Sequence, residues 1–247
     1  MRYPALAEPA PRAHIPCMLK FTPILLAVLY AIAMYRFSVW RTHRDLDARS
    51  TELADPRLKR LTDRLAASLG IAHIPVYIYE IDPVNGLAAP DGRIFITRGF
   101  FRKYQNGEVT AEELASVIAH ELGHVALGHS KRRMIDFSGQ NALRTVLIMV
   151  LGRYIPFVGT WIANLVTTML AAGLSRADEY EADEYAAALL TKAGIGTSPQ
   201  KSLFSKLESL TQERAGVAPA WLMSHPKTQD RIAALDKLEQ RWSTSQS

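Results

Sequence analysis

The chain of 247 residues contains a single cysteine, Cys17. An internal disulfide is therefore impossible, and there is no cluster of thiolates to hold a structural zinc ion. Any metal site must be built from histidine, aspartate and glutamate. Histidine is also scarce, with 7 in the whole chain, so a pair of histidines at a defined spacing is informative.

The chain has only a moderate share of charged residues, acidic or basic. Charged residues make up 21% of the chain and hydrophobic residues 48%, a composition typical of a globular protein with some membrane contact. The formal net charge of +5 suits an anionic membrane surface. No basic stretch interleaved with aromatic residues occurs, so we expect no nucleic-acid partner. No internal repeat is evident, and the length suits one domain with an additional segment.

Long apolar runs are few, and the first lies near the N-terminus. Residues 1–18 are rich in proline and alanine and predict a disordered segment. Phe21–Tyr35 carries no charge, and the apolar character continues beyond Arg36. This pattern predicts a single membrane anchor over residues 19–41, if the arginine snorkels, and hence a membrane location with the side of the main domain left open. A cleaved signal peptide with Ala31-Ile32-Ala33 at its cleavage site and a buried core helix are the alternatives.

One short motif points to metal chemistry. His120, Glu121 and His124 form the pattern H-E-x-x-H within Glu112–Ser130, where apolar residues recur at the three- and four-residue spacing of a helix. Residues four apart share a helix face, so both imidazoles can point at one metal ion. Two neutral imidazoles suit zinc, and the glutamate can polarise a metal-bound water without binding the metal. The alternative is a helix with two surface histidines.

A zinc peptidase needs a third protein ligand and an open position for water. Ser175–Asp183 is acidic and predicts the start of a second helix that runs to Lys192, with Ser175 as its N-cap. Glu179 and Asp183 are four residues apart and share a face. Glu179 can complete the zinc site, and Asp183 can accept a hydrogen bond from a ligand histidine. The alternative is a solvated acidic helix face.

The remaining pattern predicts a mainly α domain with a small antiparallel β-sheet (α+β) over residues 50–241. Thr110 and Glu113 predict a capping box before the motif helix. The strongly apolar segment 142–174 predicts an amphipathic helical hairpin that rests on the membrane or caps the site, with a second span or an ordinary core pair as alternatives. Helices are expected at 52–69, 200–213 and 230–241, and strands at 76–81 and 93–97.

The two motifs together, H-E-L-G-H at His120–His124 and S-R-x-x-E-x-x-A-D at Ser175–Asp183, resemble the HtpX-like zinc metalloendopeptidases. That family includes the CAAX prenyl proteases and several envelope quality-control proteases. The resemblance covers Leu53 to Arg231. It implies a gluzincin fold with one zinc ion between two helices. By position it implies that the zinc ligands are His120, His124 and Glu179. It also implies that Glu121 is the general base and that Asp183 supports a ligand.

The resemblance also covers two further segments. Ser224-His225-Pro226 and Arg231 match a motif in which the histidine lies near the zinc, as an oxyanion stabiliser or an inhibitory ligand, and the arginine organises the site. The family often has Ala-Phe in its substrate-binding edge strand where this chain has Gly-Leu. The edge strand is implied at Asn85, Gly86, Leu87 and Ala88.

His129 also follows the motif. A longer metzincin pattern would place a glycine at position 127 and a third histidine at position 130, but the chain has Leu127 and Ser130. We therefore do not expect His129 to be a metal ligand.

These patterns predict a membrane-anchored zinc metalloendopeptidase that hydrolyses peptide bonds of misfolded or membrane-associated proteins, with protein substrates and membrane lipid as partners. The zinc ion lowers the pKa of its water, Glu121 takes the proton and passes it to the leaving amine, and zinc with His225 stabilises the oxyanion. The alternative is a membrane-tethered chaperone or binding protein with a structural zinc site, in which His225 is the fourth ligand.

Overall fold

In the computed structural model of the chain, the described residues are 17–89, 91–129, 132, 144, 176–213 and 228–245. The chain divides into a small unit, Met1–Arg41, and a main unit, Thr42–Ser247. The predictions for residues 1–16, for the apolar hairpin 142–174 and for His225 lie outside the described residues.

The N-terminal helix α1 spans Cys17–Ala48 and contains the apolar run. It begins within the segment 1–18 that the sequence predicts to be disordered. In the part of the chain that the structure describes, no helix combines the length and the apolar character needed to cross a membrane. The anchor predicted for residues 19–41 is therefore not confirmed.

The main unit contains a four-stranded sheet in the order β1-β2-β4-β3. Its strands are β1 (Ser50–Glu52), β2 (Val76–Tyr79), β3 (Gly86–Ala88) and β4 (Ile94–Thr97). The outer pairs β1/β2 and β3/β4 are antiparallel, whereas the central pair β2/β4 is parallel. The prediction of an antiparallel sheet was therefore wrong. The chain between β2 and β4 forms its own strand on the far side of β4, so it reverses direction twice and the two central strands run the same way.

Helix α2 (Pro56–Leu69) begins later than the sequence predicts, because Ser50–Glu52 is taken up by β1. The Asp55 side chain accepts hydrogen bonds from two backbone N–H groups of the first turn. Gly70 ends the helix with a φ of 70°, a conformation that glycine adopts without a steric penalty.

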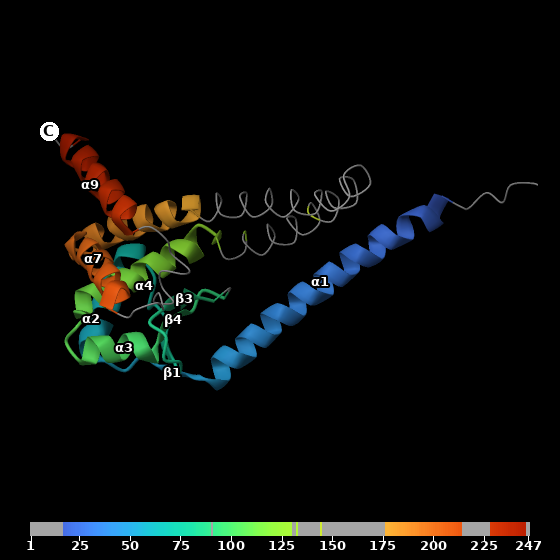
Figure 1. Ribbon diagram of the computed structural model, residues 1–247, viewed down its shortest axis with the longest axis horizontal. Coiled ribbons are helices and arrows are strands. Elements are labelled where there is room, and N and C mark those ends of the chain that lie inside the picture. Colours follow the sequence, from blue (N-terminus) through green and yellow to red (C-terminus); the bar gives the residue numbers. More distant parts are fainter. Residues whose placement is uncertain are drawn as a thin grey trace, which may run out of the picture. The chain divides into compact units, whose positions relative to one another are not determined.

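Helix α4 (Ala111–Ala126) is the centre of the main unit and carries the H-E-x-x-H motif. The predicted capping box is confirmed, because the Thr110 hydroxyl accepts from the Glu113 N–H while the Glu113 carboxylate accepts from the Thr110 N–H. Most residues of α4 are buried, since it contacts α2, α7, β3 and β4 (Figure 1). The motif is therefore held inside the protein and is not a surface feature.

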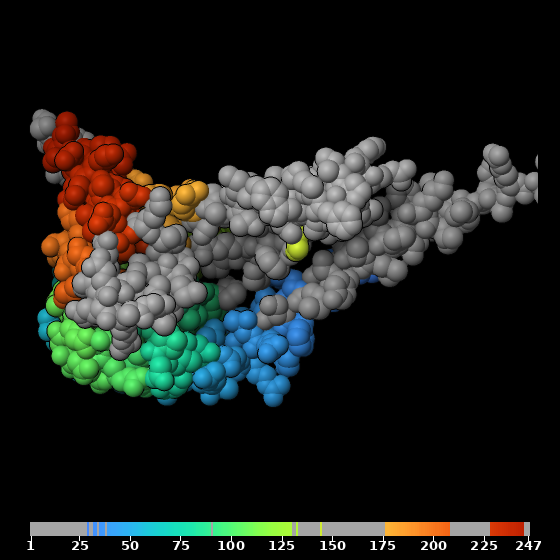
Figure 2. Space-filling model, viewed as in Figure 1, coloured from blue at the N-terminus to red at the C-terminus, as the bar shows by residue number. Residues whose placement is uncertain are grey.

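The other helices surround this centre. They are α3 (Arg98–Gln105), a helix over residues 176–192, α7 (Ser198–Glu213) and α9 (Thr228–Ser245). Helix α9 packs on α7, and the two lie together at one end of the main unit (Figure 2). The larger core lies between the helices and one face of the sheet, whereas Phe95 on the opposite face packs with Leu46 of the α1 C-terminal turn.

Candidate metal centre

The described side chains that form one group able to hold a metal ion are His120, His124 and Glu179. Nε2 of His120 lies 3.2 Å from Nε2 of His124. The Glu179 carboxylate approaches each imidazole through a different oxygen, at 3.4 Å from His120 Nε2 and 3.5 Å from His124 Nε2. All three residues are buried. The helix over residues 176–192 thus brings its acidic face to the imidazoles of α4.

This spacing fits a zinc ion. Bond lengths of 2.0–2.1 Å in a tetrahedral site place neighbouring ligand atoms about 3.3 Å apart. The three observed separations of 3.2, 3.4 and 3.5 Å agree with that value. Three lone pairs that converge in a buried space repel one another unless a cation lies between them. Within the described part of the chain the site has three protein ligands, the number that catalytic zinc sites use.

His120 is supported from behind by Asp183, one helical turn after Glu179. Nδ1 of His120 lies 2.9 Å from Asp183 Oδ1. Burial lowers the pKa of His120, but hydrogen bonds to Asp183 and Glu179 outweigh burial and raise this pKa to about 9. Metal binding must therefore displace a proton at neutral pH. Once the metal is bound at Nε2, the remaining proton lies on Nδ1 and is donated to Asp183.

Asp183 is held by α7 and α9. Arg231 of α9 donates to it through two nitrogens, at 2.6 Å and 2.7 Å, and Gln200 of α7 donates at 3.2 Å. The Arg231 guanidinium is 1% exposed and stacks on Phe204, 4.2 Å from the ring centroid. Burial raises the pKa of Asp183, but the charge of Arg231 and its hydrogen bonds lower it overall, so the carboxylate stays ionised. The chain from guanidinium to carboxylate to imidazole orients the metal ligand.

Glu121 lies buried between the metal ligands in sequence and next to β3 in space. A Cβ atom added to Gly86 would lie 3.3 Å from Glu121 Oε1 and 2.7 Å from Val117 Cγ1. Strand β3 therefore runs directly against the motif helix, and only glycine allows this approach. In the described sheet β3 is an edge strand, paired with β4 on one side. The predicted edge strand thus passes beside Glu121.

Four residues near the site were not given a role by the sequence analysis. A Cβ atom added to Gly123 would lie 3.0 Å from Ala182 Cα and from its carbonyl oxygen, so the two metal-binding helices almost touch at this point. Gln200 donates a hydrogen bond to Asp183. His129 contacts His124 but does not belong to the group of metal ligands. The small side chains of Gly123 and Ala182, one in each motif, could have predicted that the two helices pack closely. Nothing in the sequence singles out Gln200.

Comparison with known proteins agrees with this site. Residues 52–239 match peptidase family M48. The chain is 29% identical to the metalloprotease LoiP of Escherichia coli K12 over 175 residues, which cover 71% of this chain and 66% of LoiP. It is 26% identical to the human mitochondrial metalloendopeptidase OMA1 over 178 residues, 68% of this chain and 33% of OMA1.

A third relative is the HtpX protease homologue of Acaryochloris marina, 30% identical over 226 residues that cover 75% of this chain and 73% of the relative. The chain thus spans about two thirds of the length of LoiP and about a third of OMA1. The segment that matches the family includes the whole metal cluster and most of the chain. The chain therefore belongs to peptidase family M48, and the metal of this cluster is zinc.

Proposed function

We propose that this chain is a zinc-dependent metalloendopeptidase. The observation that carries the proposal is the buried trio of two imidazoles and one carboxylate at zinc-ligand spacing, with Glu121 buried on the same helix as the two histidines. LoiP, OMA1 and the HtpX homologue are named as proteases or metalloproteases, which supports the same activity here.

The mechanism assigns one task to each side chain. His120, His124 and Glu179 would hold the zinc ion, which would supply a Lewis acid and lower the pKa of a water molecule. Glu121 accepts a proton from the attacking water and delivers it to the amine that leaves. Asp183 and Arg231 keep His120 in the tautomer that presents Nε2 to the metal. His225, which lies outside the described residues, stays a proposed partner of the oxyanion.

We propose that β3 holds the substrate. An extended peptide can pair with the edge of β3 that no described strand occupies and gain backbone hydrogen bonds there without a demand on sequence. The Asn85–Ala88 segment is suited to this role because Gly86 brings the strand against Glu121. Extended, accessible backbone is a property of misfolded chains, which supports a quality-control role. The variant Gly86→Ala is expected to lower kcat/KM for peptides while its zinc content stays unchanged. Unchanged kinetics would contradict the proposal that β3 binds the substrate.

We also propose that α1 contacts membrane lipid. Aromatic and aliphatic side chains next to arginines are typical of segments at a membrane interface. Flotation with anionic vesicles tests this proposal, and the double variant Phe37→Ser/Trp40→Ser is expected to reduce the bound fraction. Equal flotation of both proteins would contradict it. Among the α1 side chains whose burial is described, the large apolar ones that are exposed are Leu29, Ile32, Tyr35, Phe37 and Trp40.

The decisive experiment compares Glu121→Gln with the wild-type protein on an unfolded protein substrate, with zinc content measured on both. General acid–base catalysis contributes about 10²–10⁴-fold to a rate, so the variant should lose activity by this factor with equal zinc. Equal cleavage by both proteins would remove Glu121 as the base. Bound zinc with four protein ligands and no cleavage by either protein would instead support a chaperone or binding protein with a structural zinc site.

A further inference from the structure

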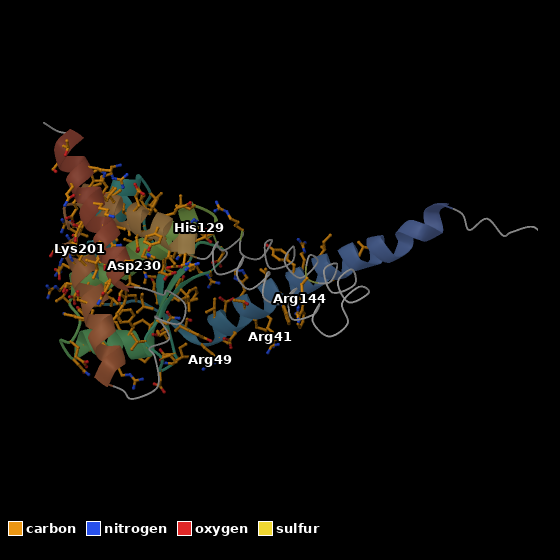
Figure 3. All side chains as sticks on the ribbon, turned by 45° about the horizontal axis from the view of Figure 1, so that its top comes forward. Arg41, Arg49, His129, Arg144, Lys201 and Asp230 are labelled. Atoms are coloured by element: carbon orange, nitrogen blue, oxygen red, sulfur yellow. The ribbon has the colours of Figure 1, made fainter. Side chains whose placement is uncertain are left out.

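His129 makes a contact with the metal site that the mechanism above does not use. It has an exposed fraction of 0%, and it lies between the end of α4 and the helix over residues 176–192 (Figure 3). Its Nδ1 lies 2.9 Å from Nδ1 of His124. Its other nitrogen, Nε2, lies 3.1 Å from Glu181 Oε2 and 3.8 Å from Asp178 Oδ1.

The proton positions in this arrangement follow from the metal. His124 presents Nε2 to the zinc ion, so its remaining proton lies on Nδ1. That N–H points at Nδ1 of His129, which must accept the hydrogen bond and must therefore carry no proton. A neutral His129 then has its proton on Nε2, where the Glu181 carboxylate accepts it. Once His124 Nδ1 is a donor, His129 Nδ1 is an acceptor and His129 Nε2 is a donor.

We propose that His129 is a positioning residue that accepts the hydrogen bond of His124 and thereby fixes the tautomer and ring plane of this zinc ligand. Partners of this kind hold a ligand ring in place and alter its basicity. The inference rests on the zinc site and is independent of peptidase activity. It also makes the two imidazole ligands unequal, because His120 donates to the anionic Asp183 while His124 donates to a neutral ring.

Burial explains why this position needs an acceptor. The His124 side chain is 5% exposed, so its Nδ1–H has little access to water. A buried N–H without an acceptor costs about 1–3 kcal/mol. An apolar residue at position 129 would fill the same space and remove this acceptor. The Glu181 carboxylate gives Nε2 of His129 an acceptor, and the Asp178 carboxylate adds a second negative charge 3.8 Å away.

Two variants separate positioning from packing. In His129→Asn the side-chain oxygen is attached to Cγ, as Nδ1 is in histidine, so an acceptor stays opposite His124. In His129→Gln the oxygen is one bond further out, near the position of Nε2, and this acceptor is lost. The readouts are zinc affinity by competition with a chelator and the absorption spectrum of the cobalt-substituted protein. The exposed His73 supplies the control variant His73→Gln.

We expect His129→Gln to bind zinc about 10–100-fold more weakly, the usual cost of losing a partner of a metal ligand. His129→Asn should keep the wild-type affinity and cobalt spectrum, and His73→Gln should match the wild type. Equal losses in the Asn and Gln variants would mean that His129 acts by packing and would overturn the proposal. Wild-type affinity in His129→Gln would overturn it as well.

A measurement on the zinc-loaded wild-type chain keeps the proposal testable if a variant fails to fold. Proton–nitrogen correlation spectra of the imidazoles should show His124 protonated on Nδ1 and His129 protonated on Nε2 alone. A proton on Nδ1 of His129 would overturn the proposal. Loss of peptide cleavage with normal zinc affinity would count against the peptidase mechanism and leave this inference intact.

Discussion

Replacement of Asp183 by asparagine tests how the metal ligand is oriented. The carboxylate accepts from four donors, since Oδ1 faces His120 Nδ1, an Arg231 nitrogen and Gln200 Nε2 while Oδ2 faces Arg231 Nε. An amide has one oxygen, so in either orientation its NH₂ group faces a donor. The change removes one charge and one acceptor with almost no change in volume. It removes the carboxylate to which Arg231 donates hydrogen bonds and leaves the guanidinium with the Glu179 carboxylate at 3.9 Å.

The expected cost is large because the pair is buried. Asp183 is 2% exposed and Arg231 1% exposed. Removing one partner of a buried ion pair costs about 3–5 kcal/mol of folding free energy. Loss of the acceptor behind His120 should weaken zinc binding by about 10–100-fold. Both effects come from one substitution, but unfolding of the metal-free protein reports the first and chelator competition reports the second.

Urea unfolding of the metal-free wild type, Asp183→Asn and a surface control measures the difference. Asp236 pairs with Lys201 at 2.9 Å, but its side chain is 51% exposed, so Asp236→Asn should cost less than about 1 kcal/mol. A loss below about 1 kcal/mol in Asp183→Asn, or equal losses in both variants, would refute the argument that the buried pair stabilises the site.

Two other predictions concern the elements that support the site. Gly123→Ala places a methyl group 3.0 Å from Ala182 Cα. We expect thermal unfolding to show a free energy of unfolding lower by about 1–3 kcal/mol, and zinc binding to be weaker. Unchanged zinc affinity would show that the helix contact does not position Glu179. Burial raises the pKa of Glu113, but hydrogen bonds from α7 and from the N-terminus of α4 lower it overall. Its stabilisation is therefore complete above the ordinary glutamate pKa of 4.5 and is lost as the pH falls below that value. Urea unfolding of metal-free Glu113→Gln should consequently lose part of the acid dependence of the wild type, and identical dependence in both would contradict this assignment.

The sequence by itself determined the local part of the metal site. The spacing of His120 and His124 defines their relation, because residues four apart on a helix share a face whatever surrounds them. The capping box at Thr110 and Glu113 is local in the same sense, since its hydrogen bonds join neighbouring residues. The family resemblance also pointed to Glu179, which the structure brings to both imidazoles.

Only the tertiary structure decided how distant segments meet. The parallel pairing of β2 with β4 depends on where the chain between them is placed, and strand patterns do not contain that information. The approach of the two metal-binding helices depends on Gly123 and Ala182, which are far apart in the sequence. The setting of His129 also depends on the fold, because Glu181 of the other metal-binding helix lies 3.1 Å from its Nε2. Such contacts arise from packing, in which each element limits the positions of the others.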